Sequence, residues 1–176
     1  MVFLYAPNLI GYARIALAVY AFAVYPTNPV PFTLLYTASA LLDAVDGHVA
    51  RALNQSTTFG AVLDMVTDRA STASLLTLLA SLNRAVAPVM QLAGAIDLAS
   101  HYAQMYASVA VGSQSHKAGK ALASAPRLLQ IYYGNKSVLF ALCAGEQLFL
   151  LSLLFSFSDY PVLISGIDIT TWLMRI

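Results

Sequence analysis

Four aspartates lie close together in an otherwise apolar chain of 176 residues: Asp43, Asp46, Asp64 and Asp68. The first pair is spaced i,i+3 and the second i,i+4, so each pair shares one face of a helix. A charged side chain at membrane depth costs at least about 2.5 kcal/mol, which indicates that such a group of acids has a function. Oxygen ligands suit hard divalent ions, and histidine or cysteine at zinc spacing is lacking here. We therefore predict that the four aspartates hold two Mg²⁺ or Mn²⁺ ions.

Small residues and an arginine accompany the acids. Gly47 follows Asp43 by one turn, and a glycine inside a helix costs about 1 kcal/mol relative to alanine. Its use is to let a ligand approach the backbone closely. Gly60 is expected to do the same on the next helix, and Arg51 offers a planar fork of donors that matches a phosphate. The combination predicts a slot for a pyrophosphate.

Other interpretations of the acids stay open at this point. Intramembrane carboxylates often form a proton or cation pathway. They are also found in structural networks, here with Arg14, Arg51 and Arg69 as possible partners, or as solvated charges at helix ends. A transport pathway usually needs polar groups through the whole depth of the membrane, whereas these acids gather at one side.

The composition indicates an integral membrane protein. Hydrophobic residues make up 59% of the chain and charged residues 10%, against about 25% charged in a soluble domain. The net charge of +1 gives no indication of nucleic-acid binding, and the single cysteine excludes an intrachain disulfide. We read no signal peptide at the N-terminus. We expect one transmembrane catalytic domain over residues 1–176.

Apolar segments separated by polar breaks predict an all-α membrane bundle with five clear transmembrane helices. A bilayer needs about 20 apolar helical residues per span. The predicted helices cover about 9–25, 31–53, 57–82, 86–111 and 137–157, and the remainder after Pro161 is too short for a confident sixth span. Positively charged residues mark cytoplasmic connections, and they lie mainly on the side of Arg51. The aspartates are therefore expected to open toward the cytoplasm.

The stretch 43–68 reads D-x2-D-G-x2-A-R-x8-G-x3-D-x3-D and resembles the signature of the CDP-alcohol phosphatidyltransferases. The segments 7–15 and 112–117 are similar to the eukaryotic phosphatidylinositol synthases within that family. The resemblance runs from about residue 7 to about residue 157. It implies a six-helix membrane fold, so the sixth helix looks truncated in this chain. An inactive scaffold is therefore a further alternative.

The resemblance also implies the chemistry. The family transfers a phosphatidyl group from CDP-diacylglycerol to an alcohol, here myo-inositol, and releases CMP. It implies a homodimer in the endoplasmic reticulum membrane, with the active site facing the cytosol. By position, the implied metal ligands are Asp43, Asp46, Asp64 and Asp68, the implied general base is Asp68, and the implied contacts to the CDP portion are Gly47, Arg51 and Thr57.

One polar pair lies outside the signature. Asp97 and His101 are i,i+4 on the fourth predicted helix, and inositol offers six hydroxyl groups for hydrogen bonding. Our hypothesis is that the pair helps to bind the acceptor. The alternative for this pair is a polar contact that serves helix packing. For the chain as a whole, the same chemistry with another alcohol acceptor stays open.

Overall fold

The computed structural model describes residues 1–25, 28–110, 127, 135–158, 163–164 and 167–168. Within these residues the fold is a bundle of five long helices, which confirms the predicted class. They are α1 (Ala6–Val24), α2 (Pro29–Ala52), α3 (Thr58–Leu82), α4 (Ala87–Ala110) and α7 (Lys136–Phe157). A 3₁₀ turn, η1 (Val2–Leu4), precedes α1. The two-residue strands β1 (Leu163–Ile164) and β2 (Ile167–Asp168), which the sequence analysis did not predict, pair antiparallel.

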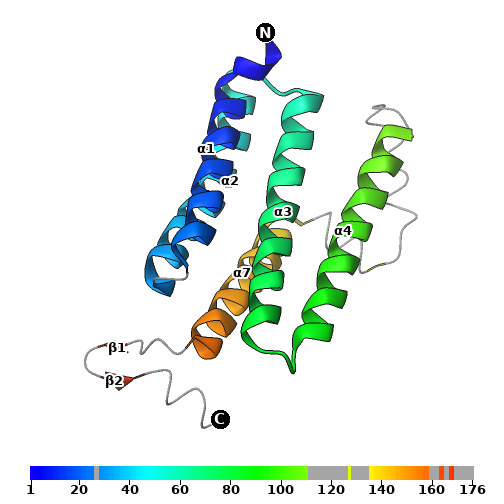
Figure 1. The fold of residues 1–176 in the computed structure, drawn as a ribbon. Coiled ribbons are helices and arrows are strands. Elements are labelled where there is room, and N and C mark those ends of the chain that lie inside the picture. The colour runs from blue at the N-terminus through cyan, green and yellow to red at the C-terminus, as the bar shows by residue number, and fades with distance from the viewer. Residues whose placement is uncertain (26–27, 111–126, 128–134, 159–162, 165–166, 169–176) are drawn as a thin grey trace.

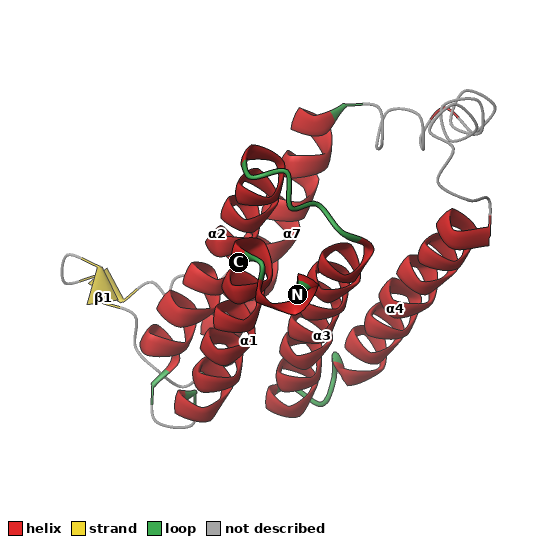
Figure 2. Ribbon diagram, turned by 90° about the horizontal axis from the view of Figure 1, so that it is seen from above, coloured by secondary structure: helices red, strands yellow, loops and turns green. Residues whose placement is uncertain are grey.

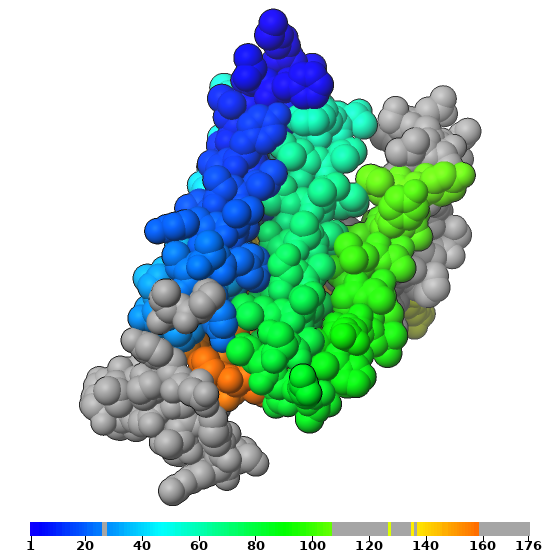
Figure 3. Space-filling view, in the orientation of Figure 1, coloured from blue at the N-terminus to red at the C-terminus, as the bar shows by residue number. Residues whose placement is uncertain are grey.

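The helices are arranged around α3. α1 and α2 lie side by side, and α3 lies between α1 and α4 (Figure 1). Viewed from above, α7 packs behind α2 and α3 (Figure 2). The face drawn in Figure 3 is built from side chains of α1, α3 and α4. Among the three helices that carry the site, α1 packs against both α2 and α3.

Capping residues explain where the helices begin. Pro7 lies in the first turn of α1, where its missing N–H costs nothing. Asn28 caps α2 by accepting from the Val30 amide at 2.8 Å. Thr57 caps α3 by accepting from the Gly60 amide at 3.0 Å, as the polar break 54–57 predicts. The capped starts of α2 and α3 lie at opposite ends of the bundle, because the two helices run antiparallel (Figure 1).

The connection between α2 and α3 is a tight turn that also holds α1. Asn54 adopts a positive φ of 53°, which asparagine tolerates better than most residues. The Gln55 amide then donates to the Ala50 carbonyl at 2.8 Å, which closes a Schellman motif. The Gln55 side chain accepts from the Ala6 amide at 3.0 Å. One short turn thus fixes the ends of three helices next to the acids.

The bundle has an apolar half and a polar half. The apolar half lies toward the ends of α1, α3 and α7 and the start of α2, and its buried core consists of Ala21, Phe32, Tyr36, Leu75, Leu76, Leu79, Leu150, Leu151 and Leu154. Phe22, Phe32 and Tyr36 pack ring against ring, with centroids 5.2–6.2 Å apart. The aspartates occupy the other half, on the side of the α2–α3 turn.

Two of the described helices are long and apolar enough to cross a membrane by length and composition alone. They are α1, with a mean hydropathy of 1.3, and α7, with 2.1. α2 and α3 carry the four aspartates together with Arg51 and Arg69, which explains why they are less apolar. Residues 112–126 of the predicted polar segment and most of the chain after Pro161 lie outside the described residues.

Candidate active site

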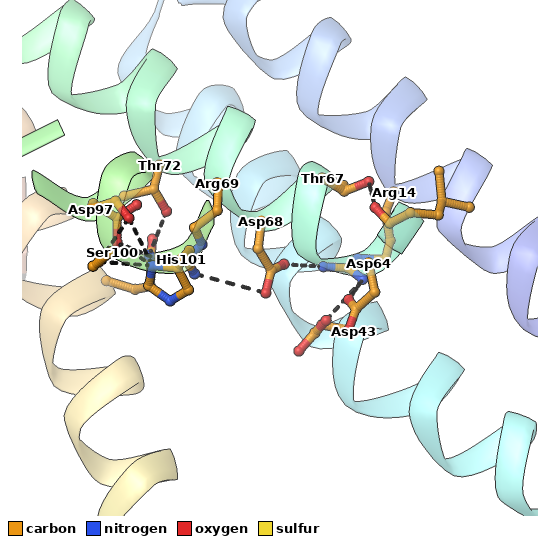
Figure 4. Close-up of polar contacts among 12 residues, drawn as sticks. Arg14, Asp43, Asp64, Thr67, Asp68, Arg69, Thr72, Asp97, Ser100 and His101 are labelled. Atoms are coloured by element: carbon orange, nitrogen blue, oxygen red, sulfur yellow. Dashed lines mark hydrogen bonds and ion pairs between the residues drawn. The ribbon is translucent and has the colours of Figure 1, made fainter. Parts of the chain in front are cut away.

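A single arginine lies among the four aspartates. Nη1 of Arg14 is 2.8 Å from Asp43 Oδ1, 2.9 Å from Asp46 Oδ2 and 2.7 Å from Asp64 Oδ1. Its Nη2 donates to Asp68 Oδ1. Arg14 is 2% exposed, so its guanidinium is held inside the bundle. Figure 4 shows the guanidinium with Asp43, Asp64 and Asp68 around it.

Three helices supply this cluster, and the spacing of the acids predicted two of them, α2 and α3. Asp43 and Asp46 share the inner face of α2, and Asp64 and Asp68 share the inner face of α3. α1 brings Arg14 between them, and the Ser39 hydroxyl donates to the Arg14 carbonyl at 3.0 Å. The structure therefore brings all four predicted metal ligands together.

The same oxygens fit a divalent cation. Asp43, Asp64 and Asp68 each offer one carboxylate oxygen, and these oxygens lie within 4.8 Å of one another. The close approach of the Arg14 guanidinium to the four carboxylates also demonstrates that they converge on positive charge. Carboxylate oxygen is the ligand that Mg²⁺ and Mn²⁺ prefer. The arrangement suits metal binding at this point of the bundle.

The acids differ in how open they are. The side chain of Asp46 is 10% exposed, whereas those of Asp43, Asp64 and Asp68 are 35–47% exposed. The three open carboxylates are the same three that form the candidate metal group. A ligand that enters the site can reach them, and Asp46 lines the neighbouring cavity.

A cavity of about 160 Å³ adjoins the cluster, lined by the ends of α1, α2 and α3. Its lining includes Asp46, Gly47, Ala50, Arg51, Gly60 and Asp64, which are six of the eight signature positions. Thr57 lines it too, and because its hydroxyl accepts from Gly60, the hydroxyl proton stays available to a ligand. The predicted residues Gly47, Arg51 and Thr57 thus share one cavity.

Several lining residues were assigned no role by sequence reasoning. Asn8 is 2% exposed and donates from Nδ2 to the Val2 carbonyl at 2.7 Å. A Cβ at Gly11 would lie 3.0 Å from Leu63 Cδ2, so glycine permits the close packing of α1 on α3. Gln55 and Ser56 line the cavity from the turn. In the sequence, an asparagine in the first turn of an otherwise apolar helix is the feature that could have indicated this wall of the cavity.

The pair on α4 lies beside the cluster rather than in it. Asp97 Oδ1 accepts from Arg69 Nη1 at 2.7 Å, and His101 Nδ1 lies 2.9 Å from the Asp97 carbonyl oxygen and 3.3 Å from Asp97 Oδ1. Arg69 in turn approaches Asp68 at 3.9 Å. Figure 4 shows the two groups joined through Arg69 and Asp68. Asp97 and His101 are therefore connected to the site through one arginine.

Comparison with known proteins identifies the family. The family described as CDP-alcohol phosphatidyltransferase matches residues 4–160, which include every residue of the cluster and the cavity. The chain belongs to the CDP-alcohol phosphatidyltransferase family. The family is embedded in membranes, which agrees with the two apolar spans described above.

Relatives of this phosphatidyltransferase carry one name across eukaryotes. The chain is 49% identical over 162 residues to the CDP-diacylglycerol–inositol 3-phosphatidyltransferase of Homo sapiens, covering 92% of this chain and 75% of the relative. It is 47% identical over 145 residues to the enzyme of that name from Saccharomyces cerevisiae, covering 82% and 65%. For the enzyme of that name from Drosophila melanogaster the identity is 46% over 165 residues, covering 94% and 71%. No solved structure matches the chain.

Replacing the central arginine tests the electrostatics of the cluster. In Arg14→Gln, four carboxylates lose their shared cation, and we expect a loss of stability of about 1–3 kcal/mol, below the ~3–5 kcal/mol of a fully buried pair because three acids are partly open. We also expect Mn²⁺ to raise the midpoint of thermal unfolding more in the variant than in the unaltered protein, since the ion neutralises the same oxygens. The measurement is thermal unfolding in detergent with EDTA and with Mn²⁺.

The matched control is Arg84→Gln, which removes the same charge from an exposed position in the α3–α4 turn. A variant at position 14 with unchanged stability in EDTA, or with no larger response to Mn²⁺ than the control, would contradict a shared cation site.

Proposed function

We propose that this chain is an inositol-specific phosphatidyltransferase. It transfers the phosphatidyl group of CDP-diacylglycerol to myo-inositol and yields phosphatidylinositol and CMP. The observation that carries the proposal is the single site in which four convergent carboxylates adjoin a cavity lined by the family's signature residues. The relatives that share 46–49% of aligned residues are named for this reaction.

The proposed roles follow the geometry. Asp43, Asp46, Asp64 and Asp68 hold two divalent ions, Mg²⁺ or Mn²⁺. When bound, such ions withdraw charge from a diphosphate and stabilise the leaving nucleotide. Arg51 stands at the exposed rim of the cavity, where its guanidinium donates to phosphate oxygens. Gly47 and Thr57 contact the CDP portion in this proposal, because both line the same cavity as Arg51.

Asp68 is the proposed general base. It lies at the border between the metal cluster and the α4 pair, and its two oxygens face different cations: Oδ1 faces Arg14 and Oδ2 faces Arg69. A carboxylate with one oxygen directed away from the metal cluster can accept a proton from an incoming hydroxyl. Asp97 and His101 belong to the acceptor side of the site in this proposal.

The surroundings of the enzyme are part of the proposal. We infer a single catalytic domain over residues 1–176, a homodimer, and a location in the endoplasmic reticulum membrane with the site open to the cytosol. The gathering of the acids near the Arg51 end of α2, on the side with more positive residues, supports that orientation. The same gathering at one end argues against an ion or proton pathway through the bundle.

An assay of CMP release tests the reaction and the acceptor together. We expect the purified chain in lipid vesicles to release CMP from CDP-diacylglycerol only with myo-inositol and Mg²⁺ or Mn²⁺, and not with EDTA. Asp68→Asn should lower kcat by at least about 10²-fold, because general base catalysis typically contributes that much. Thr77→Val, an isosteric change at an exposed position of the same helix, is the control. Equal release with serine, glycerol 3-phosphate or no alcohol would contradict inositol specificity.

A methyl group added to the cavity wall tests where CDP binds. A Cβ at Gly60 would lie 3.0 Å from Asn8 Oδ1 and 3.3 Å from Thr57 Oγ1. We therefore expect Gly60→Ala to raise the KM for CDP-diacylglycerol about tenfold, the usual effect of one methylene in a pocket, with little change in the KM for inositol. In Gly145→Ala the new Cβ meets nothing within 4 Å, so this variant is the matched control. Equal KM values in both variants would place the nucleotide elsewhere.

A further inference from the structure

Arg69 connects two polar groups that the reaction would have to bring together. Its Nη1 donates to Asp97 Oδ1 on α4 at 2.7 Å, and its Nη2 lies 3.9 Å from Asp68 Oδ2 on α3. Its side chain is 18% exposed, so it is held mostly inside the bundle. Figure 4 shows Arg69 between the aspartate cluster and the Asp97–His101 pair.

The two contacts of Arg69 differ in a way that matters for binding. The contact to Asp97 is a short charge-assisted hydrogen bond. The gap of 3.9 Å to Asp68 is too long for a direct hydrogen bond, which ends near 3.2 Å. An oxygen atom placed about 2.8 Å from both Arg69 Nη2 and Asp68 Oδ2 would lie to one side of this pair and bridge it. A hydroxyl oxygen there would accept from the guanidinium and donate to the carboxylate.

We propose that Arg69 binds the acceptor hydroxyl that attacks phosphorus, and orients it on Asp68. This inference rests on the function proposed above and adds a catalytic residue outside the family signature. The hydroxyl O–H bond breaks, and its proton passes to Asp68 Oδ2. The oxygen forms a bond to the phosphorus of the phosphatidyl group, and the bond from that phosphorus to the bridging oxygen of CMP breaks. CMP leaves with the electron pair.

The guanidinium has two effects in this arrangement. It fixes the hydroxyl with its proton directed at the base, which lowers the entropic part of the barrier. It also places a positive charge beside the oxygen as negative charge develops there, which stabilises the transition state more than the ground state. Arg14 contacts the other oxygen of Asp68, so the two arginines lie next to different oxygens of the same carboxylate.

Asp97 and His101 are positioning residues in this arrangement. Asp97 Oδ2 is buried and has no hydrogen-bond partner among the described residues, so a ligand in the open part of the site does not reach it. Oδ1 holds Arg69, and His101 contacts both the carbonyl and Oδ1 of Asp97. The pair therefore acts on the acceptor through Arg69. This proposal differs from our hypothesis from the sequence, in which the pair itself helps to bind the acceptor.

Steady-state kinetics on three variants test this assignment: Arg69→Gln, Asp97→Asn and the double variant. We expect Arg69→Gln to lower kcat about 10²-fold or more, the usual loss when one preorganised donor is removed, with an unchanged KM for CDP-diacylglycerol. Asp97→Asn should lower kcat less. In the Arg69→Gln background it should cost nothing further, because residues that act through one another are not additive. Arg84→Gln is the matched charge control, and thermal unfolding is measured for each variant.

Arg69→Lys provides a second test of the assignment if Arg69→Gln fails to fold. A lysine preserves a charged donor near Asp68 but not the fork that also holds Asp97, so its kcat should be lowered to a smaller extent. A stable variant at position 69 with wild-type kcat would overturn the assignment of Arg69 alone. Additive losses from Asp97→Asn would overturn the positioning role. Absence of inositol-dependent CMP release by the unaltered chain would instead overturn the proposed function together with this inference.

Discussion

The acidic end of this bundle depends on charge neutralisation by a cation at its centre. Four carboxylates from α2 and α3 lie around Arg14, which α1 inserts between them. One guanidinium offsets one of the four negative charges, and carboxylates so close together repel one another. Two divalent ions would more than offset the rest and leave the site positive toward an anionic diphosphate. The need for cations and the affinity for the donor substrate thus have one electrostatic origin.

The rest of the fold keeps this arrangement in place. The apolar core around Phe32, Leu75 and Leu154 holds the opposite end of the bundle. At the border between the halves, Gln147 on α7 accepts from the Tyr36 hydroxyl at 3.1 Å and donates to Thr72 at 3.3 Å. Thr72 lies one turn beyond Asp68 on the same helix, so this polar link joins α2, α3 and α7 directly behind the proposed base.

The sequence predicted much of this fold and site for physical reasons. Hydropathy and helix breaks locate the five helices to within a few residues, and helical spacing puts each aspartate pair on one face. Contacts between helices are not encoded in spacing. The sequence offered Arg14 as one of three possible partners of the acids, and only the packing of α1 on α2 and α3 shows that it contacts all four. The pairing of Asp97 with Arg69 likewise depends on how α3 and α4 pack.

Electron paramagnetic resonance of Mn²⁺ added to the purified, full chain tests the central claim most directly. If the carboxylates of α2 and α3 hold two ions in one site, Mn²⁺ binds saturably and the spectrum shows a magnetically coupled pair. Asp64→Asn should abolish the coupling, because it removes one of the three carboxylates of the candidate metal group. A spectrum of free or isolated Mn²⁺ at every concentration of the ion would contradict the claim.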